Sequence, residues 1–209
     1  MEFDSRAREW DKDPVKIERA KKFAREVKHV IETGSNKSLT AIEFGCGTGQ
    51  VSFFLKDIFR EIHLIDTSEG MLEVLHEKIR DHQIHNMFPR LRDILHDGLG
   101  MENPDVIYTL MSLHHIEELQ KVLKLFTDNL SANGYLIIGD LVKEDGSFHD
   151  HAPDFKGHNG FSRQQLLEML EPAGLKEVVY KEFFSITKKY ENGTTKDFPL
   201  FFMALQKIK

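Results

Sequence analysis

The sequence predicts an α/β fold with a doubly wound, mainly parallel sheet of seven strands and an antiparallel last strand. Three observations support this fold class. From about residue 39 onward, short apolar runs alternate with segments of helical periodicity. A cluster of glycines directly follows the first apolar run, where a strand would turn into a helix. The last two apolar runs are separated only by the polar turn 191–193, so they should form an antiparallel pair.

Two helices should precede the alternating region. Asp13 followed by Pro14 is a typical helix start, and apolar residues recur at helical spacing from there up to Gly34. A shorter helix should come first, because Phe3, Ala7 and Trp10 share one helical face. Residues 1–34 are therefore expected to form a helical cap.

The remaining elements follow in order. The expected strands are 41–44, 62–66, 87–92, 105–110, 135–141, 177–187 and 198–206. Helices should lie between them at 49–59, around 71–79, around 119–126 and after Ser162. Residues 142–161 connect the fifth strand to the last helix and are expected to form a lid on the substrate side. With no repeat and no flexible linker, residues 1–209 should be one domain.

Composition excludes several classes of function. A formal net charge of -6 provides no basic field for the phosphates of a nucleic acid. The most apolar stretch, 198–205, is far shorter than the roughly 20 residues that a membrane span requires. The amino terminus mixes acids and bases, unlike a signal peptide, and Cys46 is the only cysteine. We therefore expect a cytoplasmic protein with a small-molecule partner and neither a nucleic-acid nor a membrane partner.

The glycine cluster is suited to a cofactor. Gly45, Gly47 and Gly49 remove the side chains that would keep a ligand away from the backbone of a strand-to-helix turn. Gln50 stands where the dinucleotide fingerprint needs its third glycine, which makes a nicotinamide-dependent oxidoreductase the weaker alternative. A tight turn without a ligand is the other alternative.

The segment 43–49, EFGCGTG, resembles the first motif of class I S-adenosylmethionine-dependent methyltransferases of the small-molecule type. This resemblance implies a Rossmann-like methyltransferase fold, S-adenosyl-L-methionine as the cofactor and S-adenosyl-L-homocysteine as the product. In this family the acid that matches Asp66 accepts both ribose hydroxyls, and the pair that matches Asp93 and Ile94 contacts the adenine. The resemblance implies the cofactor-binding residues Glu43, Gly45, Cys46, Gly47, Gly49, Asp66, Thr67, Met71, Asp93, Ile94 and Leu110. For each acid, a structural cap of the next turn or helix is the alternative.

The acceptor side is less specific. Residues 110–116, LMSLHHI, resemble the L-H-H segment of the small-molecule branch of the family. His114 and His115 are candidates for proton transfer in catalysis, since imidazole titrates near neutral pH, and the alternative is that they cap the following helix. The resemblance places Trp10, His158 and Phe161 on the substrate side, and a plain packing helix is the alternative for Trp10. The spacing of His149 and His151 suggests a metal, but no cysteine or third helical ligand supports one, so we predict none.

The sequence thus predicts a methyltransferase that acts on an unidentified small molecule. A non-catalytic module that binds S-adenosylmethionine for regulation remains the main alternative, because this chemistry requires no single catalytic side chain.

Overall fold

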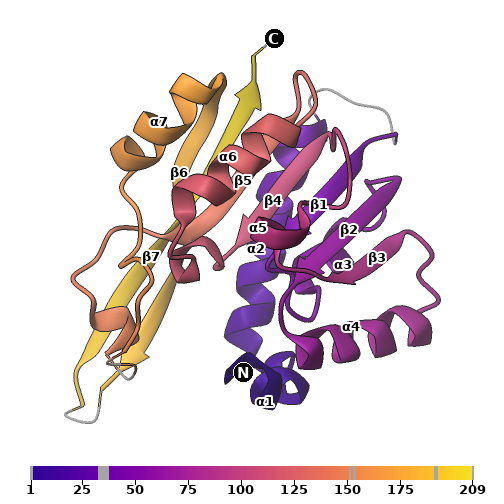
Figure 1. Ribbon diagram of the computed structural model, residues 1–209. Coiled ribbons are helices and arrows are strands. Elements are labelled where there is room, and N and C mark those ends of the chain that lie inside the picture. The colour runs from indigo at the N-terminus through magenta and orange to yellow at the C-terminus, as the bar shows by residue number, and fades with distance from the viewer. Residues whose placement is uncertain (1, 33–37, 151, 153, 191–192, 209) are drawn as a thin grey trace.

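The computed structural model describes residues 2–32, 38–150, 152, 154–190 and 193–208, and Figure 1 shows a central twisted sheet between two layers of helices. The sheet has seven strands in the order β3-β2-β1-β4-β5-β7-β6. The strands are β1 (Thr40–Phe44), β2 (Glu61–Asp66), β3 (Met87–Leu91), β4 (Val106–Leu110), β5 (Tyr135–Leu141), β6 (Leu175–Lys189) and β7 (Thr195–Lys207). Strands β1 to β5 pair in parallel, and β7 runs antiparallel between β5 and β6. The predicted fold class is confirmed.

Helices cover both faces of the sheet. The longer helices are α1 (Glu2–Trp10), α2 (Pro14–Glu32), α4 (Glu69–Asp81), α6 (Leu119–Asn129) and α7 (Arg163–Leu170). The shorter ones are α3 (Gln50–Leu55), α5 (Ile94–Asp97) and the 3-10 turns η1 (Leu113–His115), η2 (Ser147–His149) and η3 (Glu171–Ala173). Apolar side chains of α2, α3 and α4 form a core with one face of the sheet. Those of α5, α6 and α7 form a second core with the other face, so both faces are buried as a parallel sheet requires.

The closing hairpin is longer than predicted. Strand β7 pairs with β5 only from Leu200 to Gln206, whereas its pairing with β6 continues outward to Thr195. The two strands therefore leave the sheet as a two-stranded ribbon, which Figure 1 shows at the lower left. Polar contacts such as the 2.6 Å hydrogen bond from Thr187 Oγ1 to Asp197 Oδ1 support this extension, which apolar periodicity does not mark.

One local difference has a simple cause. The helix predicted over 49–59 ends at Leu55, because the Asn86 side chain donates hydrogen bonds to the carbonyls of Lys56 and Phe59 and holds that segment as a turn. Pro89 is compatible with β3 because this strand is at the edge of the sheet, where one side needs no amide donor.

Helix α1 lies beside the first turn of α4. Asp4 Oδ1 accepts hydrogen bonds from Ser68 Oγ at 2.6 Å and from the Gly70 amide at 3.0 Å. A Cβ atom on Gly70 would lie 2.9 Å from the Asp4 Cα, so the two backbones are close only because residue 70 is glycine. In the described part of the chain, no helix has the length and apolarity to cross a bilayer.

Candidate active site

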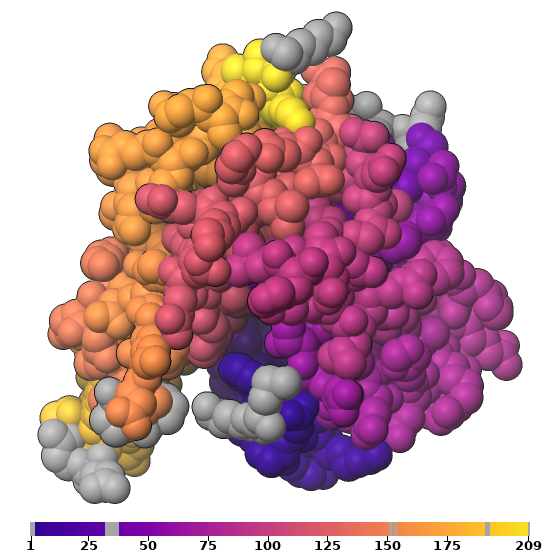
Figure 2. All heavy atoms as spheres, in the orientation of Figure 1, coloured from indigo at the N-terminus to yellow at the C-terminus, as the bar shows by residue number. Residues whose placement is uncertain are grey.

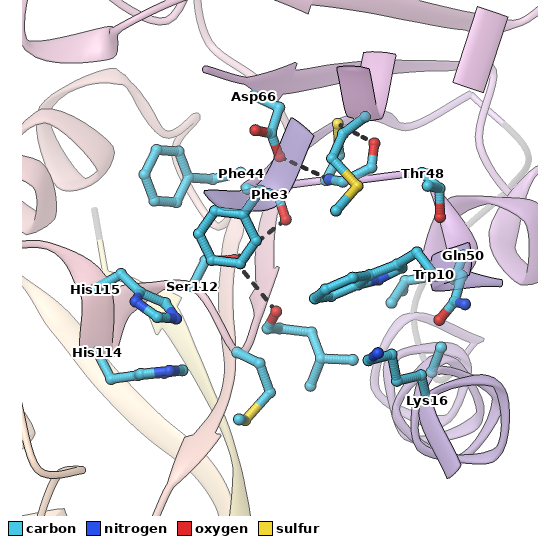
Figure 3. Close-up of a pocket in the computed structure, with 18 of the residues that line it drawn as sticks. Phe3, Trp10, Lys16, Phe44, Thr48, Gln50, Asp66, Ser112, His114 and His115 are labelled. Carbon is cyan, nitrogen blue, oxygen red and sulfur yellow. Dashed lines mark hydrogen bonds between the residues drawn. The ribbon is translucent and has the colours of Figure 1, made fainter. Parts of the chain in front are cut away.

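A cavity of about 470 Å³ opens beyond the carboxyl ends of β1, β2 and β4. This size is in the usual range for small-molecule sites, and the edge of a parallel sheet where the topology switches is their usual place. Figure 2 shows a hollow between the indigo N-terminal segment and the coral and orange atoms of later segments. Figure 3 shows Trp10 and Lys16 on one side of the cavity and His114 and His115 on the other.

The glycine loop forms the floor of this cavity. Gly45 has a φ of +66°, and a Cβ atom there would lie 2.2 Å from Ser112 Oγ, which donates a hydrogen bond to the Gly45 carbonyl at 3.1 Å. Gly47 has a φ of +52°, but a Cβ atom there would meet only the Met71 sulfur, at 3.9 Å. Gly45 is thus explained by its contact with Ser112, whereas Gly47 leaves open space for a ligand.

Asp66 at the end of β2 connects two turns and also lines the cavity. Its Oδ2 accepts the Gly47 amide at 2.7 Å, and its Oδ1 accepts the Ser68 amide at 2.9 Å. Burial raises the pKa of the carboxyl, and the backbone amides oppose the shift. Asp66 therefore caps the two turns, as the structural alternative for this acid predicts. It also faces the cavity, where its remaining lone pairs suit hydroxyl donors.

Glu43 at the end of β1 is buried beneath the loop. Its carboxyl accepts a short hydrogen bond from Ser52 Oγ in α3, and Ser52 Oγ lies 2.6 Å from the Tyr108 hydroxyl. Burial raises the pKa of Glu43 to about 8, so the side chain holds a proton at neutral pH. These contacts fix the helix that follows the loop.

The N-terminal segment closes one side of the cavity. The Trp10 ring lines it, and Lys16 Nζ lies 4.0 Å from the ring centroid. Asp11 accepts hydrogen bonds from Thr48 Oγ1 at 2.6 Å and from Lys78 Nζ at 2.6 Å. The segment is thereby attached directly to the glycine loop.

The opposite side is rich in histidine. His114 Nδ1 lies 2.6 Å from Oδ1 of Asp140, a fully buried residue of β5. His115 contacts Phe3 of α1 edge to face, with ring centroids 5.4 Å apart. The residue His115 is exposed in part, but desolvation of its imidazole, together with His114 and His149, lowers its pKa to about 3. The His115 ring is neutral at physiological pH.

Some predicted site residues do not line the cavity. Asp93 is exposed at the start of α5, where it accepts the Leu95 amide at 3.0 Å and contacts His96 Nδ1 at 2.8 Å. Ile94 and Phe161 are buried in the core. His158 contacts the Ile116 carbonyl at 2.9 Å through Nε2. Gly49 packs against Leu75, whose Cδ1 would be 2.6 Å from an added Cβ. His151 lies outside the described residues.

The other predicted residues meet at the cavity. They are Trp10, Glu43, Gly45, Cys46, Gly47, Asp66, Thr67, Met71, Leu110, His114 and His115. Their roles remain predictions.

The sequence analysis missed several cationic lining residues, among them Lys16, Arg19 and Lys188. Lys16 and Arg19 are three residues apart on α2, so they point in a similar direction. On a helix with many charges, this spacing alone does not distinguish a ligand-binding face from a solvated one. Their position is visible only once α2 is placed beside the loop.

Comparison with known proteins supports the family that the loop suggests. A methyltransferase domain family matches residues 42–136. An uncharacterized methyltransferase of Schizosaccharomyces pombe is 31% identical over 179 residues, which are 75% of this chain and 62% of that protein. A malonyl-[acyl-carrier protein] O-methyltransferase of Bacillus anthracis is 30% identical over 113 residues, which are 53% of this chain and 40% of that protein. This chain therefore spans less than two thirds of the length of these two relatives.

A crystal structure of an S-adenosylmethionine-dependent methyltransferase from Aquifex aeolicus has the same fold. The TM-score is 0.70 at 20% identity, and the alignment covers 98% of each chain. Fold and loop define a Rossmann-like protein with a nucleoside-type cofactor site. The matches in sequence and the shared fold support a class I S-adenosylmethionine-dependent methyltransferase.

Proposed function

We propose that this chain transfers the methyl group of S-adenosylmethionine to a small-molecule acceptor and releases S-adenosylhomocysteine. The observation that carries the proposal is the open space above Gly47, with the Asp66 carboxylate at its edge. Of the predicted adenine contacts, Asp93 and Ile94 do not line this space, while the neighbouring Arg92 does. The positions of the ribose and methionine parts of the cofactor are therefore better supported than the position of the adenine.

When bound, the cofactor would supply a methyl group on a positively charged sulfur: an acceptor's lone pair would form the new bond to the methyl carbon, and the carbon–sulfur bond would break with its electrons left on sulfur. The protein's task is to orient the acceptor and exclude water. Trp10 and the rest of α1 cover one side of the cavity, and His114 and His115 lie where the acceptor would approach. We propose that residues 1–34 act as a cap and residues 142–161 as a lid on this single domain.

The net charge of -6 favours a small acceptor over a nucleic acid. Cys46 is the only cysteine of the sequence and is buried, so the chain has no internal disulfide, which suits a reducing cytoplasm.

The test of cofactor binding is a thermal shift with S-adenosylmethionine, S-adenosylhomocysteine and NAD. A ligand at a hundred times its dissociation constant stabilises the folded state by about 2.7 kcal/mol. We expect a shift with both adenosyl ligands and a much smaller one for Asp66→Asn, which keeps the side-chain shape but not the charge. A shift with NAD alone would rule out the proposal.

A second measurement separates an enzyme from a regulatory module. S-adenosylhomocysteine release is followed over a panel of small hydroxyl, thiol, amine and carboxylate acceptors. Turnover with one class identifies an enzyme. Tight cofactor binding with no turnover across the panel would favour the non-catalytic module.

A further inference from the structure

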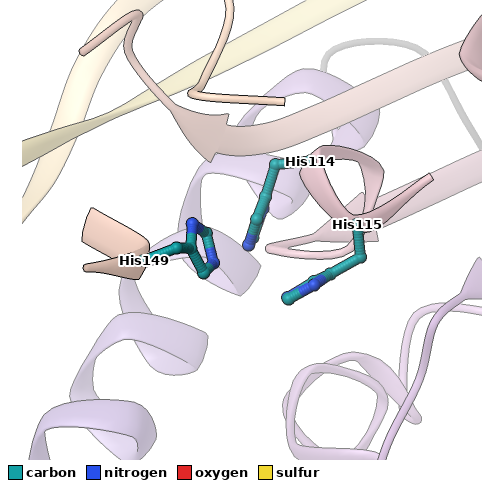
Figure 4. Close-up of side chains that lie close together, drawn as sticks. All are labelled: His114, His115 and His149. Carbon is teal, nitrogen blue, oxygen red and sulfur yellow. The ribbon is translucent and has the colours of Figure 1, made fainter. Parts of the chain in front are cut away.

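Three histidines that are far apart in the sequence meet at the acceptor end of the cavity. His114 and His115 come from η1 after β4, and His149 comes from η2 after β5. Each offers one ring nitrogen, and these nitrogens all lie within 4.8 Å of one another. Figure 4 shows the three rings around a common space, with His149 opposite the other two. All three residues line the cavity.

A buried carboxylate orients one of these rings. Asp140 Oδ1 lies 2.6 Å from His114 Nδ1, and Oδ2 accepts the His114 amide at 3.2 Å. With Nδ1 turned toward the carboxylate, Nε2 is the nitrogen that faces the other two histidines. Metal-binding histidines commonly have such a partner on the other ring nitrogen, because it fixes the tautomer and makes the ligand nitrogen more basic.

The two turns that supply the histidines are held in place. The His158 amide donates a hydrogen bond to the His114 carbonyl at 2.7 Å, and a Cβ atom on Gly157 would come within 2.1 Å of that oxygen. Phe155 stacks on His149, with ring centroids 3.7 Å apart and planes inclined by 10°. Met111, just before η1, has a φ of +58°, an uncommon conformation for a non-glycine residue that is often found at functional sites.

We propose that His114, His115 and His149 bind a divalent transition-metal ion, zinc being the expected one, with an open coordination position facing the acceptor space. Three imidazoles and an open position are a common ligand set of catalytic zinc, and the absence of carboxylates from the set disfavours magnesium or calcium. Nitrogens around tetrahedral zinc lie about 3.3 Å apart, given zinc–nitrogen bonds of about 2.0–2.1 Å. Closing the cluster thus shortens each nitrogen–nitrogen distance by about 1.5 Å at most.

The role of this ion rests on the proposed function. An acceptor hydroxyl or thiol bound at the open position would release its proton to solvent more readily, because the cation stabilises the anion that remains. That anion supplies the lone pair for methyl transfer. In this arrangement His114 and His115 are ligands, so neither acts as the general base that the sequence suggests.

The experiment measures metal binding by the full chain directly. Protein stripped with EDTA is titrated with zinc against a chromogenic chelator, and with cobalt(II), whose visible absorption reports tetrahedral coordination. The variants are His115→Ala, His149→Ala and Asp140→Asn. The matched control is His29→Ala, which removes an exposed histidine of α2 on a different surface. A thermal shift with S-adenosylhomocysteine reports whether each variant retains a folded cavity.

We expect one zinc per chain for the wild type and His29→Ala, and loss of stoichiometric zinc in His115→Ala and His149→Ala. Asp140→Asn should bind about 10- to 100-fold more weakly. If His149→Ala does not fold, the more exposed His115 decides the result. No stoichiometric zinc or cobalt in the wild type, or equal zinc affinity in His115→Ala and His29→Ala, overturns the proposal. Zinc binding without S-adenosylhomocysteine binding would instead refute the proposed function and leave the metal site intact.

Discussion

Glu43 shows how one buried carboxyl makes stability depend on pH. Its pKa is about 8 in the folded protein against an ordinary value of 4.5, because burial disfavours the charged form. Below pH 4.5 both states hold the proton. As the pH rises from there to about 8, the unfolded chain loses the proton first, so the free energy of unfolding falls by up to about 1.4 kcal/mol per pH unit.

Glu43→Gln should therefore flatten the pH dependence of stability. The amide has nearly the same size, carries no charge at any pH and can still accept the Ser52 hydrogen bond. Urea unfolding near pH 5 and near pH 8 measures the effect, with Glu18→Gln on the exposed side of α2 as the control. The variant should lose less stability than the wild type and the control as the pH rises. Parallel losses in all three proteins would contradict the buried, protonated Glu43.

Arg19 carries a buried positive charge that is suited to binding an anion in the cavity. Its Nε is buried without a hydrogen-bond partner among the described residues, and burial lowers its pKa to about 10, so it remains charged at neutral pH. It lines the cavity on the side of α2. The charges of Asp13 and Asp140 act on Arg19 and oppose the lowering of its pKa, but the Nε donor still has no acceptor among the described residues. The methionine part of the cofactor carries a carboxylate that suits this donor.

Arg19→Met should weaken S-adenosylhomocysteine binding by about 10- to 100-fold, since a hydrogen bond to a charged group contributes about 1.5–3 kcal/mol. Calorimetric titration measures the affinity, and Arg25→Met on the exposed face of α2 is the control. The free energy of unfolding without ligand should stay equal or rise. Unchanged affinity together with a raised KM for the acceptor would show that Arg19 holds an acidic acceptor instead.

At the scale of elements, the contact with α4 holds α1 beside the cavity, which Phe3, Arg6 and Trp10 line. Gly70→Leu should push α1 away, because even a Cβ atom would be 2.9 Å from the Asp4 Cα. Helix α4 itself should not suffer, since leucine has a higher helix propensity than glycine. We expect Trp10 emission to shift to the red and S-adenosylhomocysteine to dissociate faster. Glu69→Leu, on the exposed neighbouring position, should show neither effect. Wild-type emission and dissociation in Gly70→Leu would mean that α1 does not gate the cavity.

The sequence predicted the elements well where periodicity or a local motif specifies them. The glycine loop, Asp66 at the end of β2 and the hairpin of β6 and β7 all follow from short stretches of sequence. Helix α3 was predicted too long because its end depends on Asn86, about 30 residues away in the sequence. Local patterns cannot encode such a contact.

The same reason limits prediction of the site. His114 and His149 are 35 positions apart in the sequence. They meet only because β4 and β5 are neighbouring strands and the turn after each strand supplies a histidine. The spacing of His149 and His151 suggested metal ligands within one loop, whereas the structure brings together histidines from two separate turns. Likewise, the position of Arg19 at the cavity follows only from the placement of α2 beside the glycine loop.

At the scale of the whole molecule, the two apolar cores lie on opposite faces of one sheet and should unfold together. Helix α1 is different, because it is attached mainly through α4 and the glycine loop rather than through a core of its own. Trp10 is the only tryptophan and lies in α1, so its fluorescence reports this helix, whereas far-UV circular dichroism reports the whole chain.

Without ligand, we expect Trp10 fluorescence to change at a lower denaturant concentration than circular dichroism, since weakly attached elements open before the core. With S-adenosylhomocysteine at about a hundred times its dissociation constant, the global transition should gain about 2.7 kcal/mol. The fluorescence transition should then move by more than the dichroism transition and coincide with it, because a ligand beneath Trp10 links the opening of α1 to its own release. Coincident transitions in the ligand-free protein would show that α1 belongs to the same cooperative unit as the sheet and does not open as a separate cap.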